Sequence, residues 1–339
     1  MKFNILFVVL LSSLLISSCD GPVEIPKSPF EENSSSDASK LSEHKSTVFL
    51  PTLESNFNVK NNGIYAASFL MAWDEIKKEI GLPLTDFTSG QLELMNKVSS
   101  HKGVLNPEEY TTAIEVDDLI IRAKALFKMV LPFEVPFSTD VISHEFGTQP
   151  VASFGFYGTH SAANILYYHD NADFAIKLQP KNKKHEIILI KTHFGDSINF
   201  KEETERLNRK VKSFVDAKNH DNRWKYALND RDFASIPSVN FNIETNYKSI
   251  EGSTFKTEVT DYKVLEAYQR TAFLLDESGA IVESEAEVAV EEALEEEEVR
   301  IQPKRMVFNK SYLILLKRKD SKYSYFAMFL ANSELMEQR

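Results

Sequence analysis

Eight histidines and one cysteine are the residues whose types could bind a metal or act in catalysis. None of the histidines falls in an HExxH pattern or in the paired Cys/His spacing that holds a metal ion. His169-Asp170 falls at a predicted hairpin turn, where a solvated pair is commoner than a catalytic one. We therefore expect neither a metal site nor a cofactor, although five histidines lie near predicted strands: His144, His160, His169, His185 and His193.

Two other short segments contain residue types that catalysis uses. Residues 155–161 (GFYGTHS) combine glycines, hydroxyls and an imidazole. They lack the GxSxG nucleophile elbow and the Gly-rich phosphate loop, so a turn between strands is predicted. Asp117-Asp118 could exchange protons, but their position before a strand favours a role at the start of that strand. The sequence supports no enzyme.

The amino terminus carries the most specific short signal. Lys2 precedes the apolar run FNILFVVLLSSLLI, which is too short for a membrane span and is typical of a secretion signal. The run ends in Ile-Ser-Ser-Cys, which resembles the lipobox of bacterial lipoproteins, where the signal is cut before the cysteine and the thiol is acylated. Cys19 is the only cysteine, so no internal disulfide can form.

These features divide the chain into three parts. We predict a lipoprotein signal peptide over residues 1–18 and a flexible tether over 19–45, which is rich in Pro and Ser. The folded domain then covers 46–339. We expect the protein to be secreted and held on a bacterial membrane through a lipid on Cys19, at the cell envelope or surface.

The negative charge is confined to one segment. Residues 276–298 contain eleven acids and no Lys or Arg, and the formal charge of the whole chain is −11. The remaining residues therefore sum to zero. Without a basic stripe, nucleic acid is not expected as a partner.

Hydrophobic spacing predicts helices near the front of the chain and strands behind them. The helices are 64–80, which Gly81 and Pro83 end, then 91–98, a short one opened by Asn106-Pro107, and 202–215. Alternation or apolar runs predict strands at 121–129, 151–157, 163–169, 174–178, 186–191, 238–247, 273–275, 312–316 and 325–331. This order indicates an α+β protein with large antiparallel sheets.

Four segments in the last third of the chain resemble one family. Residues 236–243 (IPSVNFNI) look like its VPKFKIE strand, and 268–279 (YQRTAFLLDESG) look like its HKAFLEVNEEG. Residues 308–316 (FNKSYLILL) are similar to its FNADHPFLFLI, and 325–332 stand where its terminal strand lies. The family is the serpins, serine-protease inhibitors and their non-inhibitory relatives. The chain between the first predicted helix and Ala125 is too short for the family's full set of helices and its first large-sheet strands. The resemblance therefore implies a reduced serpin-like fold with an exposed acidic loop.

The resemblance also implies a loop mechanism. In inhibitory serpins a protease cuts the exposed loop, which then inserts as a strand into a large sheet. The hinge begins at Gly279 in the family alignment. In an inserted strand Ala280, Val282 and Ser284 would share one face, and these residues could be buried. The opposite face of that strand would carry Ile281, Glu283, Glu285 and Glu287. This face must point to water, because burying the carboxylates is costly.

Family spacing counted back from Phe308 implies a reactive bond between Arg300 and Ile301. An arginine before the bond suits a trypsin-like protease, whose specificity pocket holds an aspartate. Against this, Arg300 lies 21 positions after Gly279, several more than the family's loop has, and the excess is the run 291–298. With these extra residues, insertion of the loop could fail to distort the acylated protease, which would then be released by hydrolysis.

Two functions stay open. The first is a membrane-anchored, monomeric inhibitor of trypsin-like serine proteases. The second is a non-inhibitory surface binding module, which uses the acidic loop 276–298 for a basic partner or cations.

Overall fold

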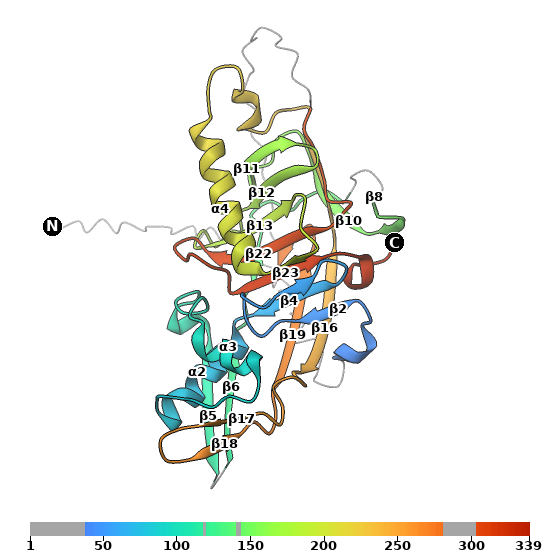
Figure 1. Ribbon diagram of the computed structural model, residues 1–339. Coiled ribbons are helices and arrows are strands. Elements are labelled where there is room, and N and C mark those ends of the chain that lie inside the picture. The colour runs from blue at the N-terminus through green and yellow to red at the C-terminus, as the bar shows by residue number, and fades with distance from the viewer. Residues whose placement is uncertain (1–37, 118–119, 140–143, 281–302) are drawn as a thin grey trace, which may run out of the picture.

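The computed structural model describes residues 38–117, 120–139, 144–280 and 303–339 (Figure 1). Its centre is a seven-stranded sheet, antiparallel apart from one parallel pair at its edge, β2 with β4. In spatial order the strands are β11 (Ala163–Asp170), β12 (Asp173–Leu178), β13 (His185–Lys191), β22 (Tyr312–Arg318), β23 (Phe326–Leu330), β4 (Asn62–Ala66) and β2 (Thr47–Phe49). With helices beside the sheets, the described part has the predicted α+β class.

The central strands are apolar runs because both of their faces are covered. Every residue of β4, β13 and β23 is buried. On one side α4 (Phe200–Asp216) lies across β11, β12 and β13 (Figure 1). Such strands read as continuous hydrophobic stretches and not as alternation.

Three α-helices occur in the described ranges, at the predicted places: α2 (Ser68–Ile80), α3 (Gly90–Lys97) and α4. The oxygen of Ser89 accepts from the N–H of Leu92, and that of Asn199 from the N–H of Glu202, so α3 and α4 are capped. The predicted helix start at residue 64 is wrong, because Ile64, Tyr65 and Ala66 belong to β4. A buried strand and a buried helix cannot be told apart by periodicity over so few residues.

A second sheet has three strands. Its main pair is antiparallel, β16 (Val239–Asn246) with β19 (Tyr268–Leu275), and β1 (Ser39–Lys40) adds to β16 in parallel. In β1, Ser39 pairs with Ile243 and also donates its hydroxyl to the carbonyl of Asn242. The end of the predicted tether is therefore part of the fold.

Shorter strands complete the described structure. They form one three-stranded sheet and five pairs: β10 (Ser153–Tyr157) with β15 (Phe233–Pro237) and β21 (Arg305–Val307); β5 (Thr111–Asp117) with β6 (Ile120–Leu126); β7 (Leu131–Pro132) with β20 (Gly279–Ala280); β8 (His144–Phe146) with β9 (Gln149–Val151); β3 (Phe57–Asn58) with β14 (Ser197–Ile198); and β17 (Thr254–Lys256) with β18 (Asp261–Lys263). No helix within the described ranges is long and apolar enough to cross a membrane.

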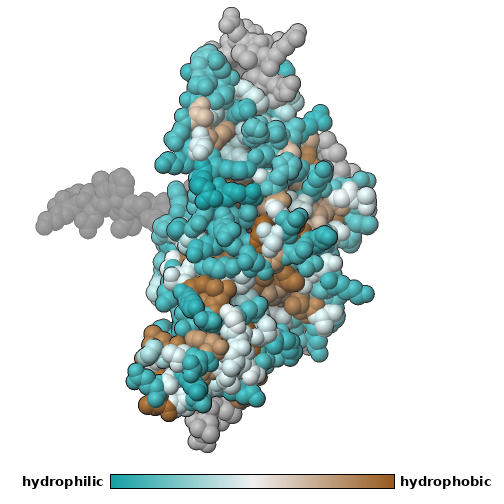
Figure 2. All heavy atoms as spheres, viewed as in Figure 1, coloured by the Kyte–Doolittle hydropathy of each residue, from teal (hydrophilic) through white to brown (hydrophobic). Residues whose placement is uncertain are grey.

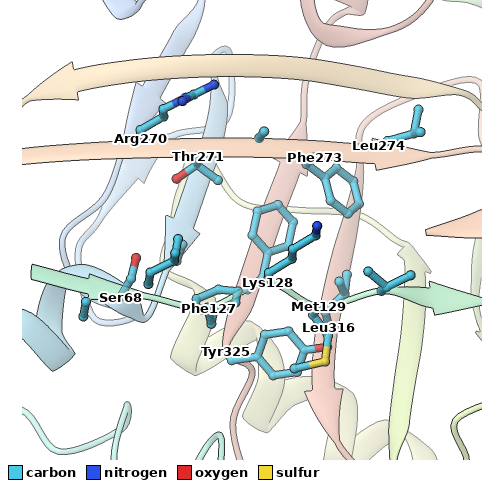
Figure 3. A pocket seen from close by; sticks show the side chains of 16 residues that line it. Ser68, Phe127, Lys128, Met129, Arg270, Thr271, Phe273, Leu274, Leu316 and Tyr325 are labelled. Carbon is cyan, nitrogen blue, oxygen red and sulfur yellow. The ribbon is translucent and has the colours of Figure 1, made fainter. Parts of the chain in front are cut away.

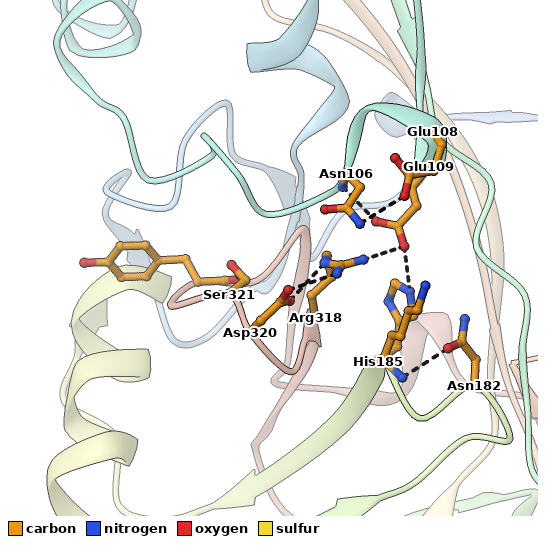
Figure 4. A network of polar contacts seen from close by, with 10 residues as sticks. Asn106, Glu108, Glu109, Asn182, His185, Arg318, Asp320 and Ser321 are labelled. Carbon is orange, nitrogen blue, oxygen red and sulfur yellow. Dashed lines mark hydrogen bonds and ion pairs between the residues drawn. The ribbon is translucent and has the colours of Figure 1, made fainter.

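A polar network ties the short 3-10 helix Pro107–Glu109 to the central sheet (Figure 4). One oxygen of Glu109 accepts from Arg318 of β22 at 2.7 Å and lies 3.1 Å from Nε2 of His185 in β13. Burial alone would raise the pKa of Glu109, but the backbone N–H of Asn106 and the Arg318 guanidinium lower it. The carboxylate therefore stays ionised, and it fastens the helical part of the chain to two core strands.

Candidate functional site

The strand that enters the acidic segment borders a narrow cavity. β19 pairs with β16 along one edge and is the last strand of its sheet in the described chain. Beyond its other edge, residues 125–130, which are the end of β6 and the residues after it, run beside β19 in the same direction (Figure 3). A cavity of about 90 Å³ separates the two segments.

The floor of this cavity is the central sheet. Tyr325 and Phe326, at the start of β23, and Leu316 of β22 line it together with the two flanking segments. Phe127 meets the ring of Tyr325 edge-on at 5.6 Å, and Phe273 of β19 stacks on Phe326 at 4.6 Å. These ring contacts fix both walls to the sheet below.

Two buried hydroxyls at the cavity lack hydrogen-bond partners within the described residues. They are Oγ1 of Thr271, on β19, and Oη of Tyr325 (Figure 3). Burial raises the pKa of Tyr325 far above its usual value, so its hydroxyl keeps the proton. Buried polar groups are nearly always hydrogen-bonded, so these two hydroxyls are exceptions among the residues that line the cavity.

A tight turn directly follows β19. Asp276 and Gly279 exchange two backbone hydrogen bonds, so the chain reverses directly after β19. The segment 133–137 holds this turn, because the N–H of Phe133 donates to Ser278 and that of Phe137 donates to Glu277. Gly279, the last residue of the turn, and Ala280 form β20, which is antiparallel to β7 with Gly279 opposite Pro132.

Only glycine fits at the first position of β20. Gly279 has a φ of +121°, and a Cβ there would lie 2.6 Å from the carbonyl oxygen of Leu131 and 2.7 Å from the N–H nitrogen of Phe133. Both contacts are with backbone atoms, which cannot move away without breaking the pairing with β7. The predicted start of the hinge is thus a point of close backbone approach.

The turn carries a carboxyl with an unusual pKa. Burial raises the pKa of Asp276 to about 6, helped by the charges of Glu277 and Glu337, although hydrogen bonds from the N–H groups of Ser278 and Gly279 oppose the change. Asp276 therefore changes charge just below neutral pH, beside the point where the chain reverses.

The chain rejoins the fold through a buried ion pair. Lys304 lies 2.7 Å from Asp232, and both side chains are fully buried. The ammonium of Lys304 also donates to the carbonyl of Trp224, and the oxygen of Asp232 accepts from the backbone N–H of Lys304. From there β21 pairs in parallel with β15. Both ends of the acidic segment are therefore firmly anchored.

Of the predicted site residues, the structure describes the first two hinge positions, Gly279 and Ala280, and places both in β20. The other predicted residues lie outside the described ranges: Cys19, Val282, Ser284, Arg300 and Ile301. No group of His, Cys, Asp and Glu in the described ranges could hold a metal ion. The predicted turn over residues 155–161 is confirmed in part: residues 158–162 connect β10 to β11, but residues 155–157 belong to β10.

Sequence reasoning missed the cavity, its two hydroxyls and the strand β7. One signal could have indicated the cavity. The alternation of residues 121–129 continues past the hairpin partner, since Thr111 of β5 pairs with Leu126 and β6 ends there. When strand-like alternation continues beyond the last residue that pairs with the hairpin partner, the remaining residues are expected to pack against another part of the protein.

Comparisons with known proteins gave structural likenesses only. No family model and no curated protein matches the chain. Three solved structures are similar to it at 12% identity: Serpin48 of the insect Tenebrio molitor, with TM-score 0.36 over 72% of this chain and 63% of that one; thyroxine-binding globulin in complex with thyroxine, with 0.38 over 78% and 66%; and a serpin of the trematode Schistosoma haematobium, with 0.39 over 64% and 58%. The chain spans less than two thirds of each of these structures.

Proposed function

We propose that this chain is a serpin-like inhibitor of trypsin-like serine proteases, with Arg300-Ile301 as its reactive bond. The observation that carries the proposal is the position of β20. The chain that leaves β19 reverses at Asp276–Gly279, and Gly279 and Ala280 pair with β7. The entry to the acidic segment thus has the geometry of a strand that has begun to join a sheet.

The direction of the strands supports insertion. β20 is antiparallel to β7, and β19 runs in the same direction as residues 125–132 (Figure 3). A strand that continued from β20 would be antiparallel to both of its neighbours, which is the usual pairing geometry.

Insertion requires the two walls to separate. Neighbouring strands lie about 4.7–4.9 Å apart, so a full strand needs far more room than a cavity of about 90 Å³. The described state is therefore closed. A cut in the acidic segment would release its amino-terminal part to move into this site, and a protease still acylated on that part would move with it.

The test is to mix the purified full-length chain with trypsin and to separate the products on a denaturing gel. We expect a covalent adduct of the summed masses, and its loss in Arg300→Ala. Arg231→Ala is the matched control, because Arg231 is an exposed arginine outside the loop. Inhibition that persists in Arg300→Ala would exclude this bond.

Clean cleavage without an adduct would favour the second function, a non-inhibitory binding module. Its acidic segment, residues 276–298, would then bind a basic partner or cations. Such binding should weaken as salt is added and disappear when residues 291–298 are neutralised. Binding that survives both changes would exclude the segment as the contact.

We also propose that the protein is held on a bacterial membrane through a lipid on Cys19. The support is the signal-like run followed by Ile-Ser-Ser-Cys, together with a tether that ends where β1 joins the fold. Expressed in a bacterium, the chain should incorporate labelled palmitate, and Cys19→Ser should abolish the label. Equal labelling of both chains would reject the anchor.

A further inference from the structure

A second, larger cavity lies far from β19, between α4, β11 and residues 217–226. Its volume is about 510 Å³, within the range of about 300–1,000 Å³ that small-molecule sites occupy. Figure 2 shows that the surface over α4 is mostly hydrophilic. None of the residues that line this cleft belongs to the hinge or to the acidic segment, so the proposed loop mechanism assigns the cleft no role.

Four cations line the cleft. Arg206, Arg209 and Lys210 share one face of α4 because they are three and four residues apart, and Lys225 faces them from the next segment. Lys210 is neutralised by Asp173 of β12 at 2.6 Å, and Arg206 pairs with Glu203.

Two of these cations have no carboxylate partner in the described ranges, Arg209 and Lys225. Arg209 is exposed, and the ammonium of Lys225 reaches only the carbonyl of His169 at 3.4 Å and the ring of Trp224. In a chain whose formal charge is −11, this leaves a local excess of positive charge in a concave site. Such a site attracts anions.

Aromatic rings also line the cleft. Phe214 and Tyr226 stack with ring centroids 4.0 Å apart and an interplanar angle of 17°. The hydroxyl of Tyr226 donates to the carbonyl of Phe214, which fixes this pair. Tyr167 and Tyr168 of β11 also line the cleft, and burial first, then the charges of Asp170 and Asp232, raises the pKa of Tyr168 to about 12, so it stays neutral.

We propose that this cleft binds a small ligand that carries an oxyanion on a flat aromatic ring. Arg209 and Lys225 hold the oxyanion, because a guanidinium fork and an ammonium both make charge-assisted hydrogen bonds to phosphate, sulfate or carboxylate oxygens. The ring packs against the edges of the stacked Phe214–Tyr226 pair, where an edge-to-face contact is favourable. The proposal is independent of protease inhibition.

The test uses 1-naphthyl phosphate as the probe, with isothermal titration calorimetry on the full-length chain. We expect it to bind at least tenfold more tightly than 1-naphthol, which lacks the anion, and than inorganic phosphate, which lacks the ring. Arg209→Gln and Lys225→Gln should each weaken binding of the probe about tenfold, the usual effect of losing one charge-assisted hydrogen bond.

Lys212→Gln is the matched control. It removes the same charge from the same helix, at an exposed residue that does not line the cleft, and it should change the affinity less than twofold. Thermal unfolding of each variant checks that the fold is kept; the two test variants serve as replacements for each other if one fails to fold. The proposal is overturned if the probe does not bind at millimolar concentration, if inorganic phosphate or 1-naphthol binds equally well, or if Lys212→Gln weakens binding as much as Arg209→Gln.

Discussion

At the scale of single residues, Gly279 decides whether the hinge can pair with β7. Gly279→Ala would place a Cβ 2.6 Å from the Leu131 oxygen and force a methyl group onto a φ of +121°. Strain of this kind costs about 1–3 kcal/mol. We therefore expect the amide of Phe133, which donates to Ser278, to exchange with solvent about 5- to 150-fold faster.

Gly252→Ala is the control for Gly279→Ala. Gly252 also has a positive φ, +80°, but a Cβ there would meet no atom within 4 Å. It lies between β16 and β17, far along the chain from the hinge, so the exchange rate of the Phe133 amide should not change. Equal acceleration in the two variants would show that the close approach to β7 is unimportant.

Asp276 should make stability depend on pH. Its pKa is raised from 3.8 to about 6 in the folded state, so between about pH 4 and 6 the folded protein holds a proton that the unfolded chain has released. The free energy of unfolding therefore falls as the pH rises through about 6. Asp276→Asn removes this loss and should stabilise the protein by about 1–2 kcal/mol at pH 7.5, after allowance for solvent screening.

The measurement is urea unfolding of both proteins at pH 7.5 and pH 4. At pH 4 the gain from Asp276→Asn should nearly disappear, because the native carboxyl is then protonated. Asp221→Asn is the control, since that side chain is 96% exposed, and its effect should stay within about 0.5 kcal/mol at either pH. A gain from Asp276→Asn that is equal at both pH values would contradict the interpretation.

At the scale of elements, one buried amide fastens β19 to the start of α2. The amide nitrogen of Gln269 donates to the carbonyl of Ala66 and the hydroxyl of Ser68, and its oxygen accepts from Tyr247 at 2.6 Å. Gln269→Leu would leave these three groups without their partner. Because an unsatisfied buried group costs about 1–3 kcal/mol, we expect a loss of about 2–4 kcal/mol in the free energy of unfolding.

A double-mutant cycle with Tyr247→Phe separates this network from simple loss of packing. Tyr247→Phe removes one of the groups that Gln269→Leu orphans, so the two losses should overlap by about 1 kcal/mol or more. Urea unfolding of the four proteins gives the coupling. Strictly additive losses would mean that the hydrogen bond between Tyr247 and Gln269 contributes nothing.

Elements with a strong local pattern were predictable, and those defined by distant partners were not. The amphipathic spacing of α4 and the alternation of β16 indicated both elements to within about two residues. β15 was missed because Ile236-Pro237 ends it with a proline, which disfavours a strand unless the chain is at an edge or an end. The cavity beside β19 has no local signature, since it depends on the approach of residues 125–130 from far along the chain.

At the scale of the whole molecule, the excess negative charge and the basic cleft at α4 belong to different parts of the chain. The eleven acids of residues 276–298 account for the formal charge of −11, while the basic cleft at α4 belongs to the balanced remainder. The hinge and the return point of this acidic segment are tied to different sheets, through β20 with β7 and through β21 with β15. A cut within the segment would therefore leave β20 and β21 on different fragments, each still paired with its own partner strand.

This arrangement predicts that cleavage stabilises the protein. If trypsin cuts after Arg300, the freed strand from β20 can join β19 and residues 125–130, and the added pairing should raise the melting temperature by several degrees. Ser284→Glu places a charge on the face predicted to be buried and should prevent the rise, since an unpaired buried carboxylate is costly. Ile281→Glu adds the same charge on the face predicted to point to water, so the cut protein should still gain stability. Differential scanning calorimetry before and after cleavage distinguishes the two variants. A melting temperature that never rises on cleavage would mean that the cavity receives no strand, whereas a rise in Ser284→Glu equal to that in Ile281→Glu would reject the predicted assignment of the two faces.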